Sequence, residues 1–104
     1  KSITLPDINP KYNSSNHLYL INLKKPNLKI KEKFIKYMLK NNILVQYHYT
    51  PIYKFSVFND KFLGKNSEYY FKSTVSLPIY YNLNRKEQLY VIKKIKYFFR
   101  KNLQ

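Results

Sequence analysis

The chain has 104 residues, of which 44% are hydrophobic and 18% aromatic, so it is long enough for one small folded domain and is not compositionally disordered. It contains no cysteine, which excludes disulfides, thiolate zinc sites and cysteine nucleophiles. Its 20 basic and 5 acidic residues give a net charge of +15, which raises the question of a nucleic-acid partner.

The positive charge is dispersed along the chain and forms no dense block. Lysines such as Lys24, Lys54 and Lys94 are far apart in the sequence. Arginine, whose planar guanidinium binds phosphate and guanine with two hydrogen bonds, occurs only at Arg85 and Arg100. We therefore treat a small basic nucleic-acid-binding module as an alternative function and not as the main hypothesis.

The chain carries no membrane or export signal that we can identify. No apolar run approaches the roughly 20 residues that a membrane helix requires, and residues 1–10 lack the charged-then-apolar layout of a signal peptide. The sequence does not begin with Met, which leads us to expect a fragment or an excised domain. We expect a cytoplasmic location and no membrane partner.

The first predicted element after the N-terminus is a strand. Residues 1–16 are predicted to form a loop, because Pro6, Pro10 and the polar run NSSN interrupt any regular pattern. Residues 17–23 (HLYLINL) are rich in apolar and aromatic side chains, which is typical of a short and mostly buried strand. Residues 25–27 (KPN) then end it.

Residues 27–41 predict an amphipathic helix. Asn27 can cap its first turn, and Asn41 and Asn42 suit a left-handed exit, where glycine is commoner. The apolar positions recur with helical spacing and are separated by lysines. They are Leu28, Ile30, Phe34, Ile35, Met38 and Leu39.

Residues 43–49 predict a second strand, which Thr50-Pro51 ends because proline restricts the residue before it and lacks an amide donor. Residues 52–66 predict an irregular aromatic segment that accommodates a helical turn. A short helix is predicted over residues 67–73, started by Asn66.

Residues 74–80 predict a third strand, interrupted by Pro78 and therefore at a sheet edge or carrying a bulge. Asn84 and Glu87 have the spacing of a capping box, which predicts the start of a closing helix. Its predicted buried stripe consists of Leu89, Ile92, Ile95, Phe98, Phe99 and Leu103.

The order of these elements predicts an α+β fold. We expect a two-layer sandwich in which a small, mostly antiparallel sheet of about three strands is packed by two main helices. The chain shows no internal repeat and no linker, so residues 1–104 are expected to form a single domain.

Most enzyme templates are absent from the sequence. A single glycine cannot build a phosphate-binding loop, and no Gly-x-Ser-x-Gly motif provides a serine nucleophile. The only histidines are His17 and His48, and a two-histidine metal site would also need a carboxylate. The five carboxylates are scattered along the chain, at Asp7, Glu32, Asp60, Glu68 and Glu87. We expect no catalytic, cofactor-binding or metal-binding residue within this chain.

The predicted strand 43–49 ends in polar and aromatic side chains. Strand alternation places Leu44, Gln46 and His48 on one face, and Ile43, Val45, Tyr47 and Tyr49 on the other. Two hydrogen-bonding side chains on one face beside a tyrosine-rich turn suit the wall of a ligand site. A histidine at a strand end that bonds only water or a carbonyl fits the same spacing, so spacing leaves both interpretations open.

Three segments together resemble a known family. They are HLYLINL, then NNILVQYHYTPIYK after a helix, then NSEYYFKSTVSLPIYYNLNRKEQLYVIKKIKYF. In this order they are similar to the C-terminal small domain of DegT-type (DegT/DnrJ/EryC/StrS) nucleotide-sugar aminotransferases, of fold type I. The motifs that carry the resemblance are Gln46-x-His48-Tyr49-x-Pro51 and Ser76-Leu77-Pro78.

The resemblance implies a function for a larger parent protein. In the parent, pyridoxal 5'-phosphate and its Schiff-base lysine would belong to a large domain that these 104 residues lack, so the fragment alone would be inactive. The implied reaction moves an amino group from an amino-acid donor, expected to be glutamate, to a UDP-linked 4-keto-6-deoxy amino sugar. This is a step toward a pseudaminic acid-like surface glycan, and a homodimer is expected. An inactive relic or interaction domain is a third hypothesis.

The resemblance also implies which residues bind substrate. His48, Gln46, Tyr49 and Tyr53 would face the sugar nucleotide from the small domain. The sequence departs from the family pattern at Asn42, where glycine is usual, and at Tyr53, where many members carry a second histidine. The second departure puts any role of that histidine in doubt here.

Overall fold

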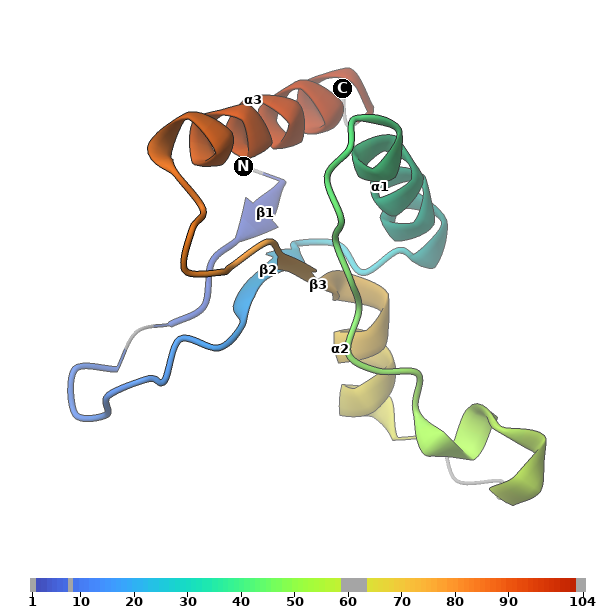
Figure 1. The fold of residues 1–104 in the computed structure, drawn as a ribbon. Coiled ribbons are helices and arrows are strands. Elements are labelled where there is room, and N and C mark those ends of the chain that lie inside the picture. The colour runs from blue at the N-terminus through green and yellow to red at the C-terminus, as the bar shows by residue number, and fades with distance from the viewer. Residues whose placement is uncertain (1, 8, 59–63, 103–104) are drawn as a thin grey trace.

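The structure, a computed structural model, describes residues 2–7, 9–58 and 64–102 and combines a small sheet with helices (Figure 1). The strands are β1 (Ile3–Thr4), β2 (Tyr19–Leu23) and β3 (Thr74–Leu77), and the α-helices are α1 (Leu28–Lys40), α2 (Lys65–Ser73) and α3 (Arg85–Asn102). Two 3₁₀ turns, Ile52–Lys54 and Ser56–Phe58, supply the helical turn expected in the aromatic segment. No helix in these described ranges is long and apolar enough to cross a bilayer.

The sheet is antiparallel with the strand order β1-β2-β3, which confirms the predicted α+β class. The membership of the sheet differs from the prediction. Its first strand comes from the predicted loop, where Ile3 pairs with Leu23. Residues 43–49 form no strand and join the sheet only through a bridge between Gln46 and Ser76.

The bridge places Ser76 inside the sheet. The Gln46 amide donates to the Ser76 carbonyl at 3.1 Å, and the Ser76 amide donates to the Gln46 carbonyl at 2.7 Å. On its other side Ser76 faces Leu20 of β2. Strand β3 is an outer strand of the sheet, as the predicted edge position requires, and the isolated bridge pairs its outer side at Ser76. The strand is also shorter than predicted, because it ends at Leu77, directly before Pro78, whose missing amide then costs no ladder bond.

Helix α1 begins and ends as its sequence predicts. The Asn27 side chain accepts a hydrogen bond from the Ile30 amide at 3.1 Å. At the other end Asn42 has φ 58°, in the left-handed region. The Ile43 amide then donates to the Met38 carbonyl at 3.0 Å, and the Asn42 amide donates to a carbonyl one residue later, which is the Schellman arrangement. Asparagine thus replaces the usual glycine at this position.

The other two helices differ in part from their predictions. Helix α2 begins at Lys65 after Gly64, two residues before the predicted start, and Asn66 does not cap it. Helix α3 has the predicted capping box, with the Glu87 amide donating to Asn84 Oδ1 at 2.9 Å and the Asn84 amide to Glu87 Oε2 at 3.0 Å.

The predicted buried stripe of α3 holds only for its C-terminal half. Ile95, Phe98 and Phe99 are buried, whereas Leu89 is 54% and Ile92 44% exposed. The C-terminal half of α3 packs on α1 through the rings of Phe98 and Phe34. The last stripe residue, Leu103, lies outside the described residues.

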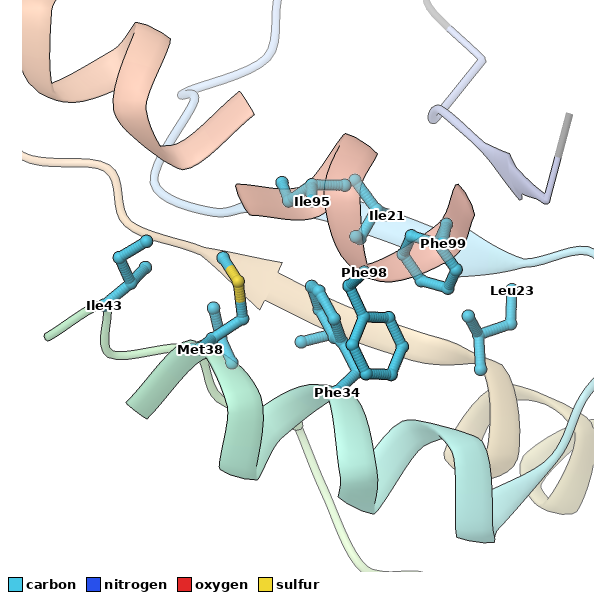
Figure 2. Close-up of a cluster of buried hydrophobic side chains, with 10 residues drawn as sticks. Ile21, Leu23, Phe34, Met38, Ile43, Ile95, Phe98 and Phe99 are labelled. Atoms are coloured by element: carbon cyan, nitrogen blue, oxygen red, sulfur yellow. The ribbon is translucent and has the colours of Figure 1, made fainter. Parts of the chain in front are cut away.

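The core lies between the sheet and the helix pair α1 and α3 (Figure 2). Phe34 of α1 is fully buried, with its ring 5.2 Å from the rings of both Phe98 and Phe99. Burial of each such side chain stabilises the fold by roughly 1.5–3 kcal/mol. The core consists of Ile21, Leu23, Phe34, Met38, Ile43, Val45, Val75, Ile95, Phe98 and Phe99. Ile43 and Val45 therefore anchor the segment that leads to His48.

Candidate functional site

The two predicted motifs meet at a pair of side chains. His48 Nε2 lies 2.9 Å from Ser76 Oγ, although the residues are 28 positions apart. The Ser76 hydroxyl also donates to the Gln46 carbonyl at 3.2 Å. Because Ser76 is held by Leu20 on one side and Gln46 on the other, the sheet register fixes the position of the hydroxyl.

The hydrogen bonds of Ser76 leave one nitrogen of His48 open. A hydroxyl has one proton, so when Ser76 donates to the Gln46 carbonyl, His48 Nε2 is the donor and Nδ1 holds a lone pair. His48 Nδ1 is buried and has no hydrogen-bond partner among the described residues. A buried polar atom without a partner costs about 1–3 kcal/mol. Nδ1 is therefore the atom of this pair for which the described residues supply no partner.

The alternation predicted for residues 43–49 holds over its first half. Ile43 and Val45 are buried, and Leu44 and Gln46 are exposed. Beyond Gln46 the chain leaves the sheet, so Tyr49 is 77% exposed instead of following Val45 into the core. The half-buried His48 turns toward Ser76, and its ring meets the Tyr49 ring edge-on at 4.8 Å between centroids.

The four predicted substrate-binding residues do not line one hollow. Gln46 lines a broad groove of about 1070 Å³ between residues 42–46, the segment after β3 and the first turns of α3. Tyr49 and Tyr53 line a second hollow of about 690 Å³, together with residues at the start of α2. His48 lies in the chain between these two surfaces.

Tyr53 belongs to an ion-pair cluster that sequence reasoning missed. Its hydroxyl donates to Glu68 Oε1 at 3.1 Å. Glu68 is buried and pairs with Lys54 Nζ at 2.7 Å and Lys72 Nζ at 3.2 Å. The hydrogen bond from Lys54 is the main reason that the pKa of Glu68 is lowered, and burial raises the pKa of Tyr53. The Tyr53 hydroxyl is thus engaged within the fold.

Lys31 is a second residue that the sequence analysis did not single out. It is 1% exposed, and its Nζ donates to the Phe71 carbonyl and lies 4.8 Å from the ring centroids of both Tyr47 and Phe71. Burial lowers the pKa of Lys31 from 10.5 to about 8, against the opposing effect of the Glu32 carboxylate. The available signal was spacing, because Lys31 stands three positions before Phe34, on the buried stripe of α1.

The comparisons with known proteins decide the family. Residues 1–96 match the model of the DegT/DnrJ/EryC1/StrS aminotransferase family. The chain belongs to this family. The match includes both segments that meet at His48 and Ser76, so the resemblance drawn from those motifs is confirmed.

Curated relatives of this DegT-family chain include transaminases of two bacteria. The UDP-4-amino-4,6-dideoxy-N-acetyl-beta-L-altrosamine transaminase of Helicobacter pylori is 35% identical over 74 residues, which cover 68% of this chain and 20% of that protein. The enzyme of the same name from Campylobacter jejuni is 37% identical over 82 residues, covering 75% and 22%. The chain therefore spans about a fifth of the curated relatives that it matches.

Solved structures agree with the DegT-family assignment. PseC of Helicobacter pylori, an aminotransferase involved in the biosynthesis of pseudoaminic acid, matches with a TM-score of 0.75 at 32% identity, over 84% of this chain and 24% of that one. A putative sugar aminotransferase of Streptococcus pneumoniae in its PMP form matches with a TM-score of 0.74 at 27% identity, over 85% and 23%. The aminotransferase TlmJ of Streptoalloteichus hindustanus shares the fold, with a TM-score of 0.85 at 14% identity, over 95% and 26%.

Proposed function

We propose that residues 1–104 are the small domain of a pyridoxal phosphate-dependent aminotransferase that acts on a UDP-linked 4-keto-6-deoxy amino sugar. The observation that carries this proposal is the pairing of His48 with Ser76, which leaves His48 Nδ1 buried without a partner among the described residues. The names of the curated relatives support the choice of a UDP-sugar substrate. Glutamate as amino donor and a homodimeric parent complete the proposal.

Lys31 does not fit the role of the Schiff-base lysine. A Schiff-base lysine needs an amine that is free to react. Lys31, the most buried lysine described, directs its Nζ to the Phe71 carbonyl and lies over two aromatic rings. We therefore propose that the pyridoxal phosphate site belongs to the large domain of the aminotransferase, outside these 104 residues.

The described residues act by binding and orienting substrate. With Ser76 fixing Nε2, the His48 ring is held so that Nδ1 can accept a hydrogen bond from one donor group of the sugar nucleotide. Gln46 and Tyr49 are exposed on either side of His48 and can contact neighbouring parts of the same ligand. Tyr53 supports this wall through Glu68 and contributes its ring, because its hydroxyl is already engaged.

The groove beside Gln46 is proposed to be covered by the rest of the aminotransferase. Five large apolar or aromatic side chains that line this groove are 40–65% exposed, namely Leu44, Ile79, Tyr80, Leu89 and Tyr90. Contiguous apolar surface of this kind marks an interface. Since the curated relatives are about five times as long as the matched region, they contain the chain needed to bury it.

An amination assay tests the proposed function. The full-length polypeptide that carries this chain is purified with pyridoxal phosphate, and a UDP-linked 4-keto-6-deoxy-N-acetyl amino sugar is added with glutamate. We expect mass spectrometry to show the 4-amino product, and the amount to fall sharply in a His48→Gln variant. A cofactor-loaded enzyme that aminates no UDP-linked keto sugar would contradict the proposal.

A further inference from the structure

We propose that Lys31 is the positioning residue of the His48–Ser76 pair. Its ammonium group connects the carboxyl end of α2, which leads into the Ser76 strand, with the ring of Tyr47, which directly precedes His48. The importance of this connection for substrate binding rests on the proposed function, whereas the connection itself does not.

The first contact of Lys31 is with the end of α2. The last carbonyls of a helix have no partner within the helix, and a cation beside them is favourable because of the helix dipole. The Tyr70 carbonyl accepts from the amide of the capping residue Thr74, and the Phe71 carbonyl accepts from Lys31 Nζ. Strand β3 begins at Thr74, two residues before Ser76. Lys31 therefore holds the last turn of α2, three residues before the Ser76 strand begins.

The second contact of Lys31 is with the segment that carries His48. Lys31 Nζ lies over the Tyr47 ring at 4.8 Å, and the Tyr47 ring meets the Phe71 ring edge-on at 6.0 Å. A desolvated ammonium over an aromatic face is held more strongly than an exposed one. Tyr47 lies after Gln46, where the chain has left the sheet. Its backbone forms no ladder there, so side-chain contacts must set the direction in which the chain continues to His48.

The charges around Lys31 explain why a cation is tolerated there. Phe71 and Tyr47 present ring faces, and Phe71 also presents its carbonyl. A second cation, Lys54, has its Nζ 5.5 Å from the centroid of the Phe71 ring, and the Glu68 carboxylate pairs with it. On α1 itself the nearest carboxylate is Glu32, which favours the charged form of Lys31. A methionine would fill the same volume but would donate no hydrogen bond and carry no charge.

The test reads the His48 ring directly, without an activity assay. In the full polypeptide that carries this chain, labelled with ¹⁵N-histidine, the His48 nitrogen signals are assigned by their loss in His48→Gln. We expect Lys31→Met to shift these signals toward those of Ser76→Ala, in which the pair is removed. Lys31→Arg, which keeps a cation and its donors, should restore them toward the wild-type positions.

Two controls make the result specific. Lys36→Met removes an exposed lysine from the same helix, and the His48 signals should stay unchanged. His17, which bonds Ser15 at 3.0 Å, should keep its signals in every variant. A folded Lys31→Met protein with wild-type His48 signals would overturn the proposal, whether or not the enzyme aminates a sugar.

A second variant covers the case in which Lys31→Met does not fold. Tyr47 is 47% exposed, so Tyr47→Leu removes the ring from a partly solvated position that tolerates change. We expect it to shift the His48 signals as Lys31→Met does. Unchanged signals in Tyr47→Leu would equally refute the role of Lys31, since the ring is its link to the His48 segment.

Discussion

The 2.9 Å contact between His48 Nε2 and Ser76 Oγ joins the two family motifs of this chain. Ser76 reaches this position because its backbone pairs with Gln46 on one side and Leu20 on the other. The contact therefore depends on three segments, and removing the hydroxyl should disturb His48 without disturbing the sheet.

A Ser76→Ala substitution tests this dependence. The backbone pairs of Ser76 remain, so we expect the melting temperature to change little. The His48 ring loses the partner of Nε2, a loss of about 1 kcal/mol that lowers kcat/KM roughly fivefold to tenfold. Steady-state kinetics of the full-length enzyme measure this. Ser56→Ala, at an exposed position in the second 3₁₀ turn, is the matched control and should leave kcat/KM unaltered.

Removing the His48 side chain should affect substrate handling more than folding. The ring is half-buried at the margin of the sheet, so His48→Ala should leave the melting temperature nearly unchanged. Loss of a hydrogen bond to substrate should lower turnover or sugar-nucleotide affinity by about tenfold or more. Calorimetry and kinetics on the same preparation separate the two effects. A large drop in melting temperature with normal kinetics would show a packing role instead.

The buried Lys31 should make the free energy of unfolding vary with pH in the alkaline range. Its pKa is about 8 in the folded chain against an ordinary 10.5, so between these values the unfolded state binds more protons. The free energy of unfolding should therefore rise as the pH increases from 8 toward 10. Denaturant unfolding at several pH values measures the rise. Lys31→Arg should abolish it, and Lys36→Met should retain it.

The unfolding measurements for Lys31 should stay below pH 10, because above that pH the titration of Tyr53 lowers the free energy of unfolding. The pKa of Tyr53 is raised above its ordinary 10.0, so its contribution is complete below that pH and is lost as the pH rises further.

The paired Glu68 should make the free energy of unfolding vary with pH in the acidic range. Its pKa is lowered from 4.5, so its contribution is present above that pH and is lost as the pH falls through the folded value. Glu68→Gln should therefore lower the melting temperature by several degrees at about pH 7. It should also flatten the loss of stability between roughly pH 5 and pH 3, the range in which carboxylates titrate. Glu32→Gln, at an exposed position, should leave that loss in place.

The capping box of α3 gives a prediction that involves no site residue. Asn84 accepts from the Glu87 amide and donates its own amide to the Glu87 carboxylate. Asn84→Ala should lower the free energy of unfolding by about 1 kcal/mol, the typical cost of losing such a cap. Denaturant unfolding measures it, and Asn82→Ala, exposed two residues earlier, should cost nothing comparable.

The sequence by itself determined the elements whose causes are local. Helix α1 follows from an apolar repeat with the caps Asn27 and Asn42, and α3 follows from the capping box at Asn84. These signals act between residues a few positions apart, so they are readable without knowing what else the chain contacts. The order of the motifs around His48 and Ser76 was likewise readable, and it indicated the family.

The tertiary structure decided everything that depends on distant segments. Only it shows that Ile3 pairs with Leu23 and that the segment up to His48 meets the sheet at one bridge. Only the structure shows that Lys31 is buried and hydrogen-bonded, because the Phe71 carbonyl that accepts from its Nζ lies 40 positions away in the sequence. Hydrogen bonds and burial between such positions depend on how the elements pack, and a local pattern carries no record of that packing.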